Sequence, residues 1–145
     1  MGLSEDEKDA IVKYRLERAN DTLFDVEFAV SNMRWNNAAN RLYYACYYAA
    51  IALLLNDGYI TRTHNGVKAL LGLHYEKEKI IDDALMKAYR KMFNLRQTGD
   101  YDDLAVLTKD EILVLIEPAK RFIKAIELLI NNKKPIIQTP DSSYP

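Results

Sequence analysis

Two arginines are the side chains of this sequence best suited to chemistry on an anion. Arg41 lies in the segment Asn40–Ala50, and both Arg41 and Arg96 have otherwise apolar helical surroundings. An unpaired guanidinium is costly to bury, so each arginine needs an anionic partner. Asp100 follows Arg96 by four residues, a spacing that brings side chains together on a helix. Arg96 can therefore serve an internal ion pair with Asp100 or a bound ligand, and we expect Arg41 and Arg96 to share a polar pocket around Asp100 and Tyr101.

Aromatic side chains follow Arg41 closely in the sequence. Large amphipathic rings pack readily, but a buried phenol also needs a partner for its hydroxyl. His64, beside Asn65 and Gly66, either caps a helix or supplies an imidazole to Arg96 if folding brings the two together. The tyrosines concerned are Tyr43, Tyr44, Tyr47 and Tyr48.

Common catalytic and cofactor motifs are absent from the sequence. It has no G-x-x-x-x-G-K-[ST], G-x-G-x-x-G, H-E-x-x-H or C-x-x-C. Neither His64 nor His74 has a glutamate three residues before it, as the di-iron motif of helical bundles requires. Cys46 lies in an apolar run, where a thiol behaves as a small hydrophobic group. We therefore expect neither a metal nor a cofactor.

The overall charge and hydropathy narrow the class of protein. A net charge of −1 gives the whole molecule no attraction for a phosphate backbone, so we expect no DNA binding, and RNA binding requires a local patch. The apolar run Leu42–Leu55 is shorter than the about 20 residues of a transmembrane helix, so no membrane association is expected. A single cysteine and a polar, acidic start predict a cytoplasmic protein.

The elements that must position these residues are helices. Apolar spacing and capping boxes at Ser4 and Thr108 predict helices over residues 5–31, 36–55, 63–73, 78–98 and 108–130, with Gly99 ending the fourth. Pro118 should kink the last helix without ending it. The second helix is apolar nearly all round and should lie at the centre. The expected fold is all-α, an antiparallel up-and-down bundle of four long helices plus one short helix, over residues 1–131, with a flexible tail over 132–145.

Three segments in this order resemble the HEPN (higher eukaryotes and prokaryotes nucleotide-binding) domain, in its small, stand-alone prokaryotic branch that is associated with nucleotidyltransferases. They are Asn40–Ala50, Thr63–Val67 and Leu95–Tyr101. The resemblance spans residues 36–128. It implies a homodimer that binds a nucleotide or RNA and acts with a nucleotidyltransferase partner in a toxin–antitoxin-like pair. The nucleotide- or RNA-binding residues it implies are Arg41, Tyr44, Arg96, Asp100 and Tyr101.

Many HEPN proteins are metal-independent ribonucleases, and their motif places a histidine four to six residues after an arginine. Here Tyr101 stands where that histidine is expected after Arg96. A phenol with its usual pKa of about 10 is a poor base at neutral pH, so we expect little RNA cleavage by this protein alone. Two alternatives stay open: a ribonuclease whose catalytic residues are Arg96 with His64 or Tyr101, and a dimerising interaction module without a nucleotide.

Overall fold

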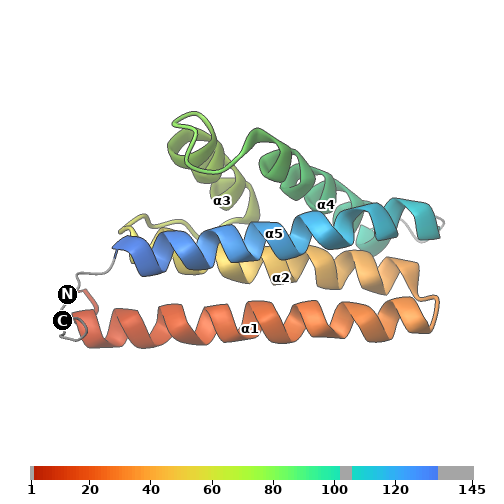
Figure 1. Ribbon diagram of the computed structural model, residues 1–145, viewed down its shortest axis with the longest axis horizontal. Helices are drawn as coiled ribbons and strands as arrows, with labels where there is room; N and C mark the ends of the chain where they lie inside the picture. The colour runs from red at the N-terminus through yellow and green to blue at the C-terminus, as the bar shows by residue number, and fades with distance from the viewer. Residues whose placement is uncertain (1, 102–105, 134–145) are drawn as a thin grey trace, which may run out of the picture.

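All regular secondary structure in the part of the chain that the structure describes is helical. The computed structural model describes residues 2–101 and 106–133, and these residues form four long helices and one short one, without a strand. This confirms the predicted fold class. Figure 1 shows how the helices are arranged. The elements are α1 (Glu5–Ser31), α2 (Trp35–Asn56), α3 (His64–Leu71), the π-helical turn η1 (Gly72–Glu76), α4 (Asp83–Tyr101) and α5 (Lys109–Lys133).

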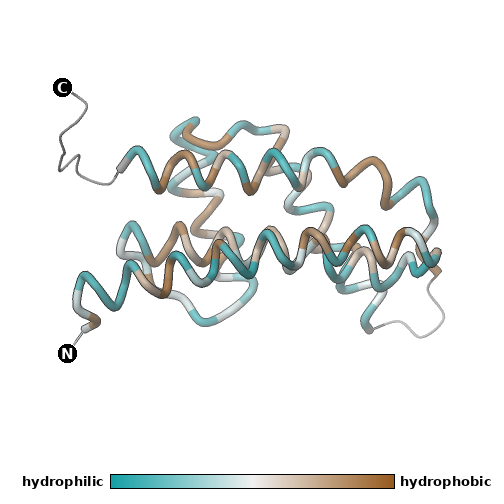
Figure 2. The backbone as a smooth tube through the Cα atoms, turned by 60° about the horizontal axis from the view of Figure 1, so that its bottom comes forward, coloured by the Kyte–Doolittle hydropathy of each residue, from teal (hydrophilic) through white to brown (hydrophobic). Residues whose placement is uncertain are grey.

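The long helices alternate in direction around α2. Figure 1 shows α1 and α2 side by side and antiparallel, with α5 alongside them and α4 inclined across the far side of α2. Helix α2 contacts α1, α3, α4 and α5. Along α1 and α5, hydrophobic stretches recur between hydrophilic ones (Figure 2), as expected for helices with one buried face. The predicted central position of the second helix is therefore confirmed.

Small and large side chains of α2 fit the helices that cover it. Buried alanines at Ala38, Ala45 and Ala49 let neighbouring helices approach closely, while Tyr43 fills the space toward α4. A layer of aromatic rings continues this core, because Tyr89 stacks on Phe122 at 5.2 Å between ring centroids. Within residues 2–101 and 106–133, no helix has the length and apolar character to cross a bilayer.

The observed ends of α1, α3 and α5 can be compared with the predicted ones. Both predicted capping boxes form: Ser4 accepts from the backbone N–H of Glu7 at 3.1 Å, and Thr108 accepts from that of Glu111 at 3.3 Å. Helix α5 continues through Pro118 and ends at Lys133, and residues 134–145 of the predicted tail lie outside the described part of the chain. The short helix ends at Leu71, where the chain enters the η1 turn instead of continuing to residue 73.

The predicted bounds of the fourth helix are wrong at both ends. It begins at Asp83 because Lys79 has a φ of 60° and the N–H groups of Ile80 and Ile81 both donate to the carbonyl of Tyr75. Ile81 is buried, so the apolar spacing extended past the true start. At the other end the helix passes through Gly99, where a Cβ would lie 3.4 Å from Leu107. That distance is an ordinary van der Waals contact, so Gly99 is one more residue of α4 and does not end the helix.

Candidate functional site

Arg96 occupies the contact between α4 and α2. Its side chain is 5% exposed, and Nη1 lies 3.7 Å from Oδ2 of Asp100, one turn further along α4. The guanidinium carbon lies 4.9 Å from the ring centroid of Tyr43 and 5.7 Å from that of Tyr44, both on α2. A guanidinium is stabilised against the faces of aromatic rings. The tyrosines of α2 and the carboxylate of α4 therefore hold this cation at the helix contact.

Asn40 connects the two arginines through one amide. Its Nδ2 donates to Oδ2 of Asp100 at 3.2 Å, and its Oδ1 accepts from Nε and Nη2 of Arg41 at 3.0 and 2.7 Å. Arg41 also lies 5.6 Å from the ring of Tyr44. The structure thus joins Arg41, Asn40, Asp100 and Arg96 into one chain of contacts, which we call the arginine site.

His64 contacts the same tyrosine cluster as Arg96. Its Nδ1 is 2.7 Å from the phenol oxygen of Tyr43, and its ring stacks on that of Tyr47 at 4.5 Å. The capping interpretation of His64 is wrong, because Thr63 is the residue that accepts the N–H of Gly66 at 2.8 Å. Tyr43 therefore contacts His64 and Arg96 together, although the two come from different helices.

The protonation of this cluster follows from burial and from the charge of Arg96. Burial lowers the pKa of His64 below its usual value, and the positive charge of Arg96 lowers it further. Burial raises the pKa of Tyr43 to about 12, with Arg96 acting in the opposite direction. At neutral pH the imidazole and the phenol are therefore both uncharged. When Nδ1–H donates to the phenol oxygen, Nε2 keeps a lone pair that can accept a proton.

Comparison with known proteins identifies the family. The sequence model of the HEPN domain matches residues 12–129, which is most of the chain. The chain belongs to the HEPN domain family. It is similar to a UPF0332 protein of Thermotoga maritima, with 37% identity over 88% of this chain and 97% of the relative. Two proteins of Methanocaldococcus jannaschii named "putative toxin" are 30% and 27% identical, over 77% and 79% of this chain and 83% and 74% of their own lengths.

Tyr44, Tyr101 and Cys46 are other residues of this HEPN domain that the sequence analysis considered. Tyr44 is half-buried between Arg41 and Arg96, whereas Tyr101 ends α4 and its side chain lies outside the described part. Cys46 is fully buried, and burial raises the pKa of its thiol, so it does not act as a thiolate nucleophile. Among the described residues, no group of three or more His, Cys, Asp or Glu side chains is placed to hold a metal ion.

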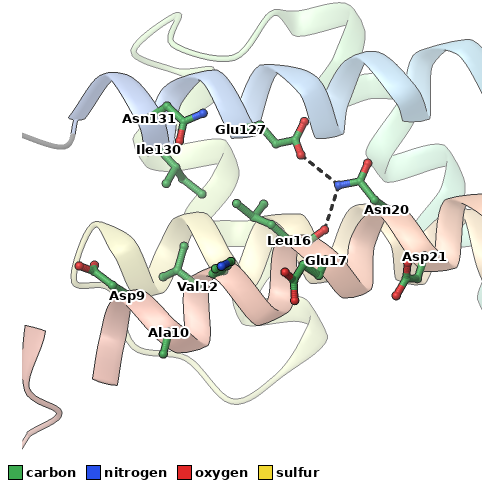
Figure 3. Close-up of a pocket in the computed structure, with 11 residues that line it drawn as sticks. Asp9, Ala10, Val12, Leu16, Glu17, Asn20, Asp21, Glu127, Ile130 and Asn131 are labelled. Atoms are coloured by element: carbon green, nitrogen blue, oxygen red, sulfur yellow. Dashed lines mark hydrogen bonds between the residues drawn. The ribbon is translucent and has the colours of Figure 1, made fainter. Parts of the chain in front are cut away.

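A groove of this HEPN domain lies away from the arginine site. The groove between α1 and α5, shown in Figure 3, has a volume of about 640 Å³ and an apolar floor that includes Val12, Leu16 and Ile130. Asn20 bridges it by donating to the carbonyl of Leu16 and to Glu127, each at 3.0 Å. Carboxylates also line this groove, at Asp9, Glu17, Asp21 and Glu127. Because these charges repel phosphate, the groove is a poorer site for a nucleotide than the arginine site.

Sequence reasoning missed the connecting role of Asn40 and the phenol bond of Tyr43. A signal for Asn40 was present, since an amide directly precedes Arg41 in an apolar helix, where a polar side chain needs a partner. The bond between Tyr43 and His64 joins residues that are 21 positions apart. Helical periodicity gives no information about such a pairing, so only the packing of α3 against α2 could reveal it.

Proposed function

We propose that this HEPN domain binds a nucleotide or RNA at the arginine site and acts with a nucleotidyltransferase partner in a toxin–antitoxin-like pair. The observation that carries the proposal is the buried Arg96, held beside Asp100 and linked through Asn40 to Arg41. A guanidinium fixed in one orientation is well suited to bind phosphate oxygens in pairs. The half-buried ring of Tyr44 offers a surface on which a base can stack.

The charges of the site favour binding of an anion over a neutral ligand. Among the described residues of the arginine site, two guanidinium groups are connected by one carboxylate and one neutral amide, a set of charges that suits an anionic ligand. The toxin names of two archaeal relatives support a toxin-like role for the protein. Family membership also supports a homodimer, in which two such sites would be present.

Binding measurements test the proposal directly. The wild type, Arg96→Ala and Arg96→Lys are each titrated into a fluorescently labelled RNA hexamer. In a separate experiment, ATP is titrated into each protein. We expect Arg96→Ala to weaken binding at least tenfold, and Arg96→Lys to restore part of it, because lysine keeps the charge but loses the paired geometry. Unchanged affinity in Arg96→Ala, or no binding by the wild type, would contradict the proposed site. Co-purification from the native host should recover a nucleotidyltransferase.

A metal-independent ribonuclease is the second candidate, and one observation favours it. Tyr43 contacts an uncharged His64 at its phenol oxygen and the guanidinium of Arg96 over its ring. His64 could accept the proton of a ribose 2′-hydroxyl while Arg96 stabilises the charge on the attacked phosphate. Removing such a base typically lowers the rate about 10²- to 10⁴-fold.

A cleavage assay separates the two candidates. Purified protein is incubated with mixed RNA in excess chelator, together with His64→Ala, Arg96→Ala and Tyr101→Phe. The binding proposal predicts little or no cleavage by the wild type. Robust cleavage that His64→Ala and Arg96→Ala abolish would instead establish the ribonuclease, and loss in Tyr101→Phe would add that phenol to the reaction.

A further inference from the structure

Arginines and tyrosines continue beyond the arginine site across the contact between α1 and α2. Arg18 of α1 donates from Nη2 to the phenol oxygen of Tyr48 at 2.8 Å and from Nη1 to that of Tyr14 at 3.3 Å. Its guanidinium carbon also lies 4.6 Å from the ring centroid of Tyr48. The ring of Tyr48 lies 6.0 Å from that of Tyr44, which contacts Arg41 and Arg96. Cations and rings thus follow one another from Tyr14 to Arg96.

Helical spacing places these side chains on one stripe of each helix. On α2, Arg41, Tyr44 and Tyr48 are separated by three and four residues, and on α1, Tyr14 and Arg18 are separated by four. Tyr14 is 56% exposed, and the other four side chains are partly exposed. A ligand in solution can therefore reach the whole stripe, which we call the arginine–tyrosine ribbon and define as Tyr14, Arg18, Arg41, Tyr44 and Tyr48.

A polar hollow lies at the Arg41 end of the ribbon. It has a volume of about 480 Å³, and its walls include the guanidinium groups of Arg34 and Arg41 and the amides of Asn32 and Asn37. Asp25 contributes a carboxylate to the same walls. The two arginines still leave the lining with an excess of positive charge. The hollow thus provides donors for a phosphate next to the last ring of the ribbon.

We infer that the arginine–tyrosine ribbon is a path for a single RNA strand leading away from the arginine site. The inference rests on the proposed function and specifies its ligand as an oligonucleotide rather than a free mononucleotide. Unpaired bases stack on aromatic rings, and guanidinium groups between the rings bind the phosphates that connect those bases. A phosphate accepts a stronger, charge-assisted hydrogen bond from Arg18 than the phenol oxygens that accept from it now.

The dimensions of the ribbon set the length of RNA that it fits. Arg41 and Tyr48 are seven residues apart on α2, which corresponds to about 10 Å along the helix axis. Stacked nucleotides rise by about 3.4 Å each. The ribbon on α2 therefore accommodates about three nucleotides beyond the one held at Arg96, and a hexamer covers the whole path.

Length dependence of RNA binding is the test. Affinities of the full-length protein for a uridine dinucleotide and a uridine hexamer are compared by calorimetry and fluorescence anisotropy. We expect the hexamer to bind at least tenfold more tightly. Arg18→Ala and Tyr48→Ala should each weaken hexamer binding about tenfold, in the range for loss of one stacked base, and change dinucleotide affinity less than about twofold. Arg18→Ala should also reduce the slope of log affinity against log salt by about 0.7.

Matched variants separate the ribbon from general effects of mutation. Tyr48→Phe keeps the ring and should bind the hexamer within about twofold of the wild type. Arg121→Ala removes the same charge from an exposed position on α5 and should also leave binding unchanged. Thermal unfolding of Arg18→Ala and Tyr48→Ala within a few degrees of the wild type shows that these variants are folded.

Three outcomes would overturn the inference. Equal affinity for dinucleotide and hexamer, both lost in Arg96→Ala, would refute the ribbon and leave the proposed function intact. A wild type that binds neither RNA would refute the proposed function itself and the ribbon with it. Unchanged RNA binding in Arg18→Ala and Tyr48→Ala, together with a changed mass by light scattering, would assign the ribbon to protein association instead.

Discussion

Removing the phenol oxygen of Tyr43 tests the contact that brings His64 to the arginine site. Tyr43 is fully buried, and its ring packs among Tyr44, Tyr47, Tyr89 and Phe93, so Tyr43→Phe keeps the packing. It removes the phenol oxygen that lies 2.7 Å from Nδ1 of His64 and that also interacts with the hydroxyl of Tyr89. A hydrogen bond of this kind contributes about 0.5–1.5 kcal/mol to stability. His64 is partly exposed, so water can replace the lost partner. We therefore expect a loss of about 1 kcal/mol and a Tm lower by about 2–4 °C.

A double-mutant cycle isolates this bond from other effects. Urea unfolding is measured for the wild type, Tyr43→Phe, His64→Gln and the double variant, and the expected coupling energy is about 1 kcal/mol. Tyr47→Phe keeps the ring that stacks on His64 and serves as the matched control, with an expected change below about 0.5 kcal/mol. A coupling energy below about 0.3 kcal/mol would refute the bond and remove the basis for placing His64 beside Arg96.

Three further predictions concern pH, the core and association. Because the pKa of His64 is lowered in the folded chain, the unfolded chain binds a proton first as the pH falls through 6.5, so stability should fall from about pH 7.5 to 5.5. Urea unfolding at both pH values should show this loss, and His64→Gln should reduce it. Phe122→Ala should destabilise the protein by about 3–5 kcal/mol, because it removes a fully buried ring that stacks on Tyr89. If Tm falls by less than about 3 °C, the prediction is wrong. Light scattering should give about twice the chain mass of 16.7 kDa, and a monomer at micromolar concentration would contradict the predicted homodimer.

Local signals in the sequence predicted most helices accurately. The helix over residues 5–31 has the predicted bounds, because the capping box at Ser4 marks its start and the segment from Asn32 to Arg34 interrupts it. The start of α4 was missed because Ile80 and Ile81 fit a helical period, while a left-handed residue at Lys79 sets the actual path. Such a conformation carries no propensity signal in a lysine.

The candidate site was predictable where its residues are neighbours on a helix. The four-residue spacing of Arg96 and Asp100 is a local feature, and the structure has that ion pair. The approach of His64 depends instead on how α3 packs on α2, and the contact of Arg18 with Tyr48 depends on the register of α1 against α2. Periodicity shows which face of a helix is apolar, but it does not fix the register between two helices.

The two hydrogen-bonding roles of Asn40 limit which residues can replace it. Its amide uses the oxygen toward Arg41 and the nitrogen toward Asp100, so only a side chain with both an acceptor and a donor satisfies both neighbours. Aspartate at this position would face the carboxylate of Asp100, and leucine would leave both contacts unmade. Positions 40, 41, 96 and 100 therefore form one unit for protein engineering: a graft of the site onto another helical bundle must transfer all four together.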